Sequence, residues 1–299
     1  MEHEGNIWVV GGDRRQASLA WLLAQEGHTV HTYALELGRP PALNLIPETG
    51  LEGIHRADCI ILPMTVSKGG GRLNTPLAEG DYPLTEVLDR LRPSQFLCGG
   101  RVDDESRTMA RERGLSIRDY FDREELAVAN AVPTAEGAVQ IALEELPITI
   151  HGSRVLVIGF GRVGRLTAQR FGALGARVTV AARKYEQLAW ARAMGFEGES
   201  LGRMAGWLCA YDLVVNTVPA PVLGRAELED LGEDCLILDL ASQPGGVDRA
   251  AAEKLRRRVI HALALPGKVA PVTAGAAIRD AIYHMILESQ GVTPERKPQ

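Results

Sequence analysis

The segment whose chemistry is easiest to interpret is a glycine-rich turn in the second half of the chain. Its residues are Gly159, Phe160, Gly161, Arg162, Val163 and Gly164. An apolar run precedes the turn, and a segment with helical periodicity follows it and closes at Gly175. In a strand–turn–helix unit, the first glycine makes the tight turn, the second brings backbone N–H groups to a pyrophosphate, and the third lets the helix pack closely. We therefore expect these six residues to bind a dinucleotide; the alternative is a structural glycine turn.

The end of the next predicted strand indicates which dinucleotide is bound. Enzymes that use NAD normally carry an Asp or Glu there, which binds the ribose 2′-OH. This sequence has Arg183 and Lys184 instead, and no carboxylate. Both cations suit a 2′-phosphate, Arg183 through charge-assisted hydrogen bonds and by stacking on the adenine. We expect NADP(H) as the cofactor; the alternative is that two surface cations merely end a strand.

Further cofactor contacts are expected where later strands end. These residues are Thr217, Val218, Pro219, Ala241 and Ser242. Ligands bind at the carboxyl ends of parallel strands in sheets of this kind. Residues 265–268 are expected to end another strand at the same edge.

A second glycine turn, at residues 11–12, follows the first apolar run but lacks the third glycine. This departure favours a degenerate Rossmann-like domain that binds the substrate rather than a nucleotide. Arg14 and Arg15 could hold a carboxylate bidentately at this turn. The alternative for Arg14 is an ion pair with Asp13 or Asp104.

The glycine-rich loop at 65–71 offers groups that suit an oxyanion, the Ser67 hydroxyl and the Lys68 ammonium. We expect both to bind substrate, together with Arg14, Asn130 and Thr134. Thr134 also follows Pro133 at the start of a predicted helix, where it would act as the N-cap. No histidine–aspartate pair stands out, so no catalytic residue is assigned.

These side chains require a frame of alternating strands and helices. Short apolar runs alternate with helical segments through both halves, a pattern typical of βαβ units and parallel sheets. Strands are expected at 6–12, 28–35, 57–64, 96–100, 115–121, 153–161, 176–184, 212–219, 235–242 and 259–267. Helices are expected at 16–27, 103–113, 133–146, 163–174 and 273–289.

The predicted fold class is α/β, with two Rossmann-like, doubly wound parallel-sheet domains, an interdomain cleft, and two long helices that bridge the domains. The substrate domain is expected at 1–132 and a linking helix at 133–150. The NADP domain is expected at 151–272, and a C-terminal helix at 273–299 would return toward the first domain.

The composition limits the classes of function that need to be considered. The 299 residues are 45% hydrophobic and carry a net charge of −5. This balance suits two packed domains and argues against binding to nucleic acids or membrane surfaces. No apolar run reaches the roughly 18 residues of a membrane span, and the N-terminus lacks the pattern of a signal peptide. We therefore expect a cytoplasmic protein.

The four cysteines, Cys59, Cys98, Cys209 and Cys235, are far apart in the sequence. They match no metal-ligand spacing, so we expect no metal site. Buried, reduced thiols explain them best.

Several segments together resemble the family of the dipicolinate synthase A subunit, nearly from end to end. They are GGDRRQ (11–16), ILP (61–63), NAVPTAEG (130–137), IHGSRVLVIGFGRVG (150–164), DLASQPGG (239–246) and LPGKVAPVTAG (265–275). The resemblance implies an NADP-dependent oxidation of dihydrodipicolinate, derived from a lysine-pathway intermediate, to pyridine-2,6-dicarboxylate. It also implies a two-domain Rossmann-like architecture, the flavoprotein-like B subunit of dipicolinate synthase as partner, and a role in the mother cell of sporulating bacteria. The loop at 68–75 departs from the family pattern, with more glycine and a lysine.

The residues are compatible with this chemistry, since Arg14, Ser67, Lys68 and Asn130 could neutralise a small ring with two carboxylates. Two alternatives stay open. A non-catalytic, regulatory NADP-binding subunit would carry the same motif. A 2-hydroxy-acid dehydrogenase would need a histidine base near the final strands, and residues 262–283 contain none. The oligomeric state is also open, and a homo-oligomer is one of the options.

Overall fold

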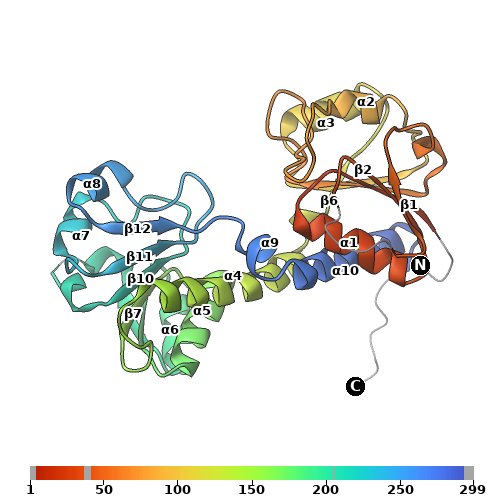
Figure 1. Cartoon of the computed structure of the whole chain (residues 1–299). Coiled ribbons are helices and arrows are strands. Elements are labelled where there is room, and N and C mark those ends of the chain that lie inside the picture. Colours follow the sequence, from red (N-terminus) through yellow and green to blue (C-terminus); the bar gives the residue numbers. More distant parts are fainter. Residues whose placement is uncertain (1–4, 37–41, 205, 293–299) are drawn as a thin grey trace, which may run out of the picture. The chain divides into compact units, whose positions relative to one another are not determined.

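The computed structural model describes residues 5–36, 42–204 and 206–292. The chain divides into two compact units (Figure 1). Unit 1 comprises residues 1–129 and 270–299, and unit 2 comprises residues 130–269. Each unit contains one six-stranded sheet in which all the paired strands are parallel.

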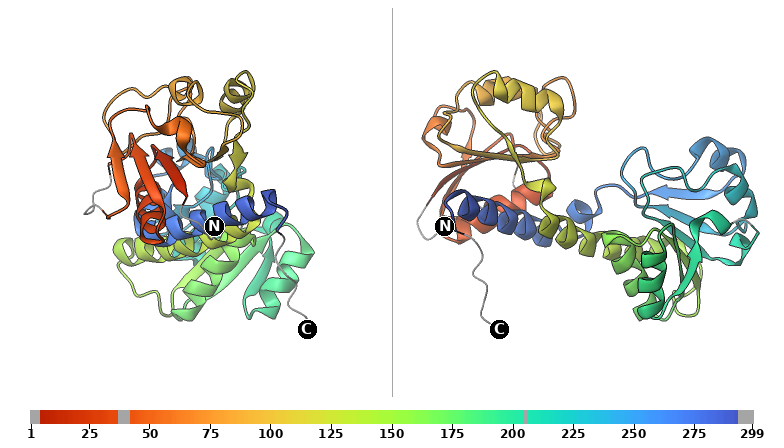
Figure 2. Two further views of the ribbon diagram at one scale, coloured as in Figure 1. Left: turned by 90° about the vertical axis from the view of Figure 1, so that its right-hand side faces the viewer. Right: turned by 180° about the vertical axis from the view of Figure 1, so that it is seen from behind.

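Unit 1 has the strand order β3-β2-β1-β4-β5-β6. The strands are β1 (Asn6–Val10), β2 (Thr29–Tyr33), β3 (Leu45–Glu48), β4 (Cys59–Met64), β5 (Phe96–Gly100) and β6 (Arg118–Asp119). The helices are α1 (Arg14–Gln25), α2 (Leu84–Leu88), α3 (Asp104–Arg111) and α10 (Pro271–Ser289), with 3-10 turns at Ile54–Arg56 and Tyr120–Asp122. Helices α1 and α10 cover one face of the sheet, and α2 and α3 lie over the other (Figures 1 and 2).

The alternation of side chains along β1 builds two core layers in unit 1. Ile7 and Val9 pack with residues of α1 and α10, whereas Trp8 and Val10 pack with residues of α2 and α3. Both faces of the central strands are therefore covered, which is why these strands are continuous apolar runs in the sequence.

Unit 2 has the strand order β12-β11-β10-β7-β8-β9. The strands are β7 (Arg154–Ile158), β8 (Arg177–Ala182), β9 (Glu197–Ser200), β10 (Leu213–Asn216), β11 (Leu236–Asp239) and β12 (Arg258–His261). The helices are α4 (Glu124–Glu145), which begins in unit 1, α5 (Arg162–Ala173), α6 (Tyr185–Ala193), α7 (Arg225–Asp230), α8 (Arg249–Lys254) and α9 (Leu265–Val269). There are also 3-10 turns at Leu201–Arg203 and Leu208–Ala210.

Both sheets share the doubly wound order in which the first strand of the unit lies at the centre and the chain then winds outward in both directions. This confirms the predicted fold class of two Rossmann-like parallel sheets. In such a sheet, loops at the carboxyl ends of the strands surround the ligand.

The structure corrects the expected boundaries around the long central helix. α4 begins at Glu124, nine residues before the predicted start at Pro133, and contains Pro133 in its interior. Thr134 is therefore not an N-cap; its hydroxyl donates to the carbonyl oxygen of Asn130, one turn earlier, at 2.7 Å. The segment at 265–268 was expected to end a strand, but it forms α9, because β12 already ends at His261.

One expectation about apolar stretches also needs correction. Among the described residues, α4 is long and apolar enough to cross a membrane by length and composition, and 44% of the qualifying window is buried. Ala138 and Ala142 of this helix are fully buried in the core of unit 2. Core helices of soluble proteins meet the same criterion, so α4 is weak evidence for a membrane span.

The cysteines differ from the expectation at one position. Cys59, Cys98 and Cys235 are buried, but Cys209 is exposed. Desolvation raises the pKa of the Cys98 thiol well above its usual value and that of Cys235 to about 12. Because the thiolate is the reactive form, these two buried thiols are unreactive near neutral pH.

We expect an aromatic disulfide reagent to modify one thiol per native chain quickly and the other three only after unfolding. The substitution Cys209→Ser should remove the fast phase, and Cys235→Ser, as the control, should leave it intact. The measurement is the release of the coloured thiolate over time. A fast phase that persists in Cys209→Ser would contradict the assignment.

Candidate functional site

The glycine-rich turn joins β7 to α5, as the motif predicted. Gly159 has a φ of +92°, and a Cβ added there would lie 2.5 Å from Oγ1 of Thr217. A Cβ added at Gly164 would lie 2.1 Å from the carbonyl oxygen of Gly159. The fold of the chain itself therefore requires both of these glycines.

Gly161 is different, because nothing in the described chain requires it. It is the N-cap of α5 with an ordinary φ of −83°, and a Cβ added there would meet no atom within 4 Å. The residue leaves bare backbone beside open space at the start of a helix, as a pyrophosphate requires. This cradle fits a dinucleotide.

The side chains of the turn have separate roles. Phe160 is fully buried and contacts the ring of Phe196 edge-on at 6.4 Å, so only its backbone is available to a ligand. Arg162 is exposed at the first position of α5, and Val163 is half-buried. Arg165 donates to the carbonyl oxygen of Phe160 at 3.2 Å and stabilises the turn.

Arg183 and Lys184 directly follow β8, and both are exposed. The Lys184 ammonium lies 3.4 Å from a carboxylate oxygen of Glu186. In the part of the chain that the structure describes, the Arg183 guanidinium has no recorded hydrogen bond or ion pair. Arg183 is therefore the freer of the two cations for an anionic ligand.

Residues at the carboxyl end of β10 are tied to the neighbouring strand β7. Both the backbone N–H and the hydroxyl of Thr217 donate to the carbonyl oxygen of Ile158, at 2.9 and 2.8 Å. Val218 is half-buried and Pro219 is exposed. The two strand ends thus hold residues 217–219 beside the glycine turn, where an added Cβ of Gly159 would also lie 2.8 Å from a Val218 methyl.

The sequence predicted no role for the carboxylate of Asp239. Its carboxylate is buried at the end of β11, where one oxygen accepts from Asn216 Nδ2 at 2.8 Å and from the N–H of Ala241 at 3.2 Å. The other oxygen accepts from the N–H of Gly246 at 2.9 Å. Asp239 therefore holds the loop at 240–246, on which Ala241 is buried and Ser242 is exposed.

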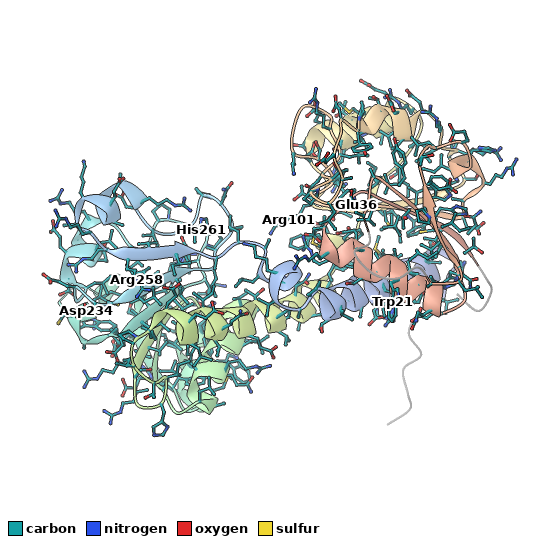
Figure 3. The ribbon with its side chains drawn as sticks, viewed as in Figure 1. Trp21, Glu36, Arg101, Asp234, Arg258 and His261 are labelled. Carbon is teal, nitrogen blue, oxygen red and sulfur yellow. The ribbon has the colours of Figure 1, made fainter. Side chains whose placement is uncertain are left out.

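His261 supports the same loop from β12 (Figure 3). Its Nε2 lies 2.8 Å from the carbonyl oxygen of Ala241 and so carries the proton, and its Nδ1 contacts the guanidinium of Arg249. Both ring nitrogens are engaged. These contacts indicate a structural role for His261.

In unit 1, the corresponding turn after β1 is closed by its own chain. A Cβ added at Gly12 would lie 2.6 Å from Gln16, and the Gly12 N–H donates to the carbonyl oxygen of Asn74 at 2.9 Å. A Cβ added at Gly11 would lie 3.0 Å from Thr75. A pyrophosphate has no room here, as expected for a degenerate turn.

Of the two arginines at this turn, Arg15 is not available to a substrate. Its guanidinium forms a bidentate pair with Asp13, at 2.7 to 3.1 Å, and donates to the carbonyl oxygen of Met64 at 3.1 Å. The expectation that Arg15 could bind a carboxylate is therefore wrong. Arg14 is exposed, and no pair with Asp13 or Asp104 is recorded within the described ranges.

The remaining predicted substrate residues lie in two places. In the loop after β4, Ser67 is buried and its Oγ accepts from the N–H of Gly69 at 2.9 Å, while Lys68 is exposed. On α4, Asn130 is buried, and its Oδ1 has no partner within the described residues. Thr134 donates its hydroxyl proton to Asn130, which leaves it only lone pairs to offer.

Comparison with known proteins agrees with this division of the chain. Residues 6–121 match the family model of the N-terminal domain of the dipicolinate synthase A subunit. Residues 131–265 match that of the NAD-binding domain of D-isomer specific 2-hydroxyacid dehydrogenases. The A subunit of dipicolinate synthase from Bacillus subtilis (strain 168) is 32% identical over 289 residues, which cover 95% of this chain and 96% of that protein.

Solved structures give the same result. The structure of the dipicolinate synthase A subunit from Bacillus halodurans has a TM-score of 0.87 and 28% identity, covering 94% of this chain and 97% of that one. The A chain of dipicolinate synthase from B. subtilis has a TM-score of 0.86 and 31% identity, covering 97% and 98%. The transhydrogenase from Sinorhizobium meliloti, at 16% identity and a TM-score of 0.71 over 95% and 94%, shares the fold.

Proposed function

This chain belongs to the family of the dipicolinate synthase A subunit, and from that premise we propose that it oxidises dihydrodipicolinate to pyridine-2,6-dicarboxylate with NADP. The substrate loses a hydride from a saturated ring carbon and a proton, and the products are the aromatic dicarboxylate, NADPH and H⁺. NADP, when bound, supplies the hydride acceptor. Gain of aromaticity favours the forward direction.

The observation that carries the proposal is the contrast among the three glycines of the motif. The packing of the chain accounts for Gly159 and Gly164, whereas Gly161 has no role in the described chain except to leave its backbone open. A ligand with a pyrophosphate explains that openness. The match of residues 131–265 to a dehydrogenase nucleotide-binding domain supports an oxidoreductase.

The residues proposed to hold the dinucleotide are those of the glycine turn and the neighbouring strand ends. They are Gly159, Phe160, Gly161, Arg162, Val163, Gly164, Arg183, Lys184, Thr217, Val218, Pro219, Ala241 and Ser242. Backbone N–H groups at the start of α5 would bind the pyrophosphate. The exposed Arg183 would pair with the 2′-phosphate.

The substrate dicarboxylate is proposed to bind to the five residues that the sequence predicted for it. The Arg14 guanidinium, the Lys68 ammonium and the Ser67 hydroxyl supply cations and a hydrogen-bond donor, and Asn130 supplies an amide. Thr134 offers its lone pairs. The task of this chain is mainly to orient the ring and to neutralise its charge, and positioning alone lowers the barrier substantially.

We expect Arg183→Ala to raise the Kd for NADP by about 10- to 50-fold, because a charge-assisted contact to the 2′-phosphate is lost. The Kd for NAD should rise much less, since NAD lacks that phosphate and would lose only the stacking of Arg183 on the adenine. Lys184→Ala should have a smaller effect, because Glu186 already engages the Lys184 ammonium. The measurement is titration calorimetry with both cofactors.

The matched control for this prediction is Arg177→Ala, which removes an exposed arginine from the amino end of the same strand. It should change neither Kd. Equal affinity of Arg183→Ala and the unmodified chain for NADP would show that NADP is not selected at this position.

The main alternative is a non-catalytic NADP-binding subunit. The family name implies a partner subunit, and we propose that this partner is the flavoprotein-like B subunit of dipicolinate synthase and that both work in the cytoplasm of the mother cell of a sporulating bacterium. The test mixes the chain with NADP and freshly made dihydrodipicolinate, with and without that partner. Formation of NADPH and of the dipicolinate band by the chain alone would exclude a non-catalytic subunit. Formation of both only with the partner would make this chain an incomplete enzyme.

A second alternative is a 2-hydroxy-acid dehydrogenase, because residues 131–265 match the nucleotide-binding domain of that family. Residues 262–283, near the final strand, contain no histidine base. His261, which directly precedes this segment, has both ring nitrogens engaged. Oxidation of D-lactate or D-glycerate by the chain is therefore not expected.

A further inference from the structure

Arg101 is an unassigned cation at the carboxyl edge of the unit 1 sheet, directly after β5 (Figure 3). The residue is exposed, and its guanidinium carbon lies 4.4 Å from the centre of the Phe121 ring. Its φ of +51° is uncommon for a residue with a side chain. Within the described ranges, no acceptor is recorded for the guanidinium, so its hydrogen-bond donors are free.

The charge of Asp119 partly offsets that of Arg101 and raises the pKa of its guanidinium, but the recorded hydrogen bonds of the Asp119 carboxylate go to other donors. One oxygen of Asp119 accepts from the backbone N–H of Arg101 at 3.0 Å and of Phe121 at 2.8 Å. The other accepts from the N–H of Val102 at 2.7 Å and from the guanidinium of Arg107 at 3.4 Å. Asp119 thus shapes the backbone under Arg101 and leaves the Arg101 side chain unpaired.

The neighbouring arginine adds positive charge at the same edge. Arg15 keeps its guanidinium on Asp13 and on the carbonyl oxygen of Met64. Although Arg101 is exposed as a whole, partial desolvation lowers the pKa of its guanidinium, and the charge of Arg15 lowers it further. An anion bound here would offset the positive charge of both arginines.

A backbone hydrogen bond between the preceding residues brings the Ser67 and Arg101 positions close to each other. The N–H of Val66 donates to the carbonyl oxygen of Gly100 at 3.1 Å. Ser67 directly follows Val66, and Arg101 directly follows Gly100. Ser67 is buried, and its Oγ already accepts from Gly69. Its O–H proton has no recorded acceptor in the part of the chain that the structure describes.

We propose that Arg101 and Ser67 together bind one carboxylate of the dicarboxylate substrate. Arginine presents two parallel N–H groups that match a carboxylate, and the serine hydroxyl donates a third hydrogen bond. The inference rests on the proposed function. It assigns to Arg101 the selection of a dicarboxylate over a monocarboxylate. The cation–π contact with the Phe121 ring supports the guanidinium.

The second carboxylate would be left to Arg14. The turn that carries Arg14 follows β1, and β4, with Ser67 on its loop, lies between β1 and β5 in the sheet. The ends of β1 and β5 are therefore about 10 Å apart, from two interstrand spacings. Long arginine side chains from both ends can reach one small ring, and each can take one carboxylate.

The test is calorimetric binding of dipicolinate, and of the monocarboxylate picolinate, to the full-length chain saturated with NADP. Arg101→Gln should weaken dipicolinate binding by about 10- to 100-fold and should remove most of its advantage over picolinate. The Kd for NADP should not change. Arg101→Lys should recover only part of the affinity, because an ammonium cannot form the bidentate pair.

The matched control is Arg118→Gln. Arg118 stacks on Phe96, at the other end of β5, with 4.7 Å between the guanidinium carbon and the ring centre, so this variant loses a similar contact away from the proposed site. If Arg101→Gln binds dipicolinate with the affinity of the unmodified chain, Arg101 does not bind a carboxylate. The proposed function would not be affected by that result. If the unmodified chain binds NADP but not dipicolinate, the proposed function fails and the inference fails with it.

Discussion

Gly161→Asp is expected to lower the affinity for NADP by at least about 100-fold and to leave the stability of the chain unchanged or slightly higher. The aspartate would meet no atom of the described chain, and Asp is among the best N-cap residues for a helix. Its carboxylate would occupy the space that the pyrophosphate needs and would repel it. The measurements are the Kd by calorimetry and the Tm.

The control for this prediction is Gly164→Ala in the same motif. There the added methyl would lie 2.1 Å from a backbone oxygen, so the chain should lose about 3 kcal/mol of folding stability. One glycine substitution thus removes binding without unfolding, and the other acts through the fold. Binding of NADP to Gly161→Asp with the wild-type Kd would show that the pyrophosphate does not lie at this turn.

Asp239→Ala is expected to destabilise unit 2 by at least about 3 kcal/mol, because three donors lose their buried acceptor. These donors are the Asn216 amide and the N–H groups of Ala241 and Gly246. The loop at 240–246 should lose its fixed conformation, and NADP binding should weaken in parallel. Asp239→Asn keeps the shape but turns one acceptor into a donor, so its effect should be intermediate.

The unfolding transition that NADP shifts to higher temperature identifies unit 2 in this experiment. Asp234→Ala is the matched control, since Asp234 is an exposed aspartate in the turn just before the same strand (Figure 3). Its effect should be within about 0.5 kcal/mol. Similar transition temperatures for Asp239→Ala and Asp234→Ala would mean that the Asp239 network does not support the loop.

The parts of the fold that could be predicted from the sequence depend on local patterns. The buried strands β1, β4, β7 and β10 are continuous apolar runs, which is typical of parallel sheets covered on both faces. The motif from Gly159 to Gly164 combines its strand, turn and helix signals within a short stretch of chain. These elements could therefore be predicted from the sequence.

The parts that were missed lack such a pattern. The edge strands β3 and β9 have the sequences LIPE and EGES, which carry little apolar signal because one side of an edge strand is open. The start of α4 was missed because Pro133 was taken as the first residue of the helix, although helices tolerate an interior proline when the packing compensates. The short helices α2, α6, α7 and α8 were also not predicted.

The candidate site shows the same limit. The three glycines of the motif and Arg183 were predicted because they occupy known positions of a dinucleotide-binding motif. The pairing of Arg15 with Asp13 depends on side-chain rotamers, which the spacing of residues does not indicate. Arg101 was overlooked because its significance depends on β4 lying beside β5 and on Asp119 being fully engaged. The role of Asp239 was not predicted for a similar reason, since its three partners lie on β10 and in the loop at 240–246.

The central claim is that this chain transfers a hydride from dihydrodipicolinate to NADP, and deuterium tracing tests it most directly. The full-length chain is mixed with NADP and with substrate deuterated at its saturated ring carbons, and the cofactor is recovered for mass spectrometry. We predict one deuterium in the nicotinamide ring of each NADPH formed, with an equal amount of dipicolinate. Dipicolinate formed without deuterated NADPH, or no reaction by a chain that binds both ligands, would contradict the account.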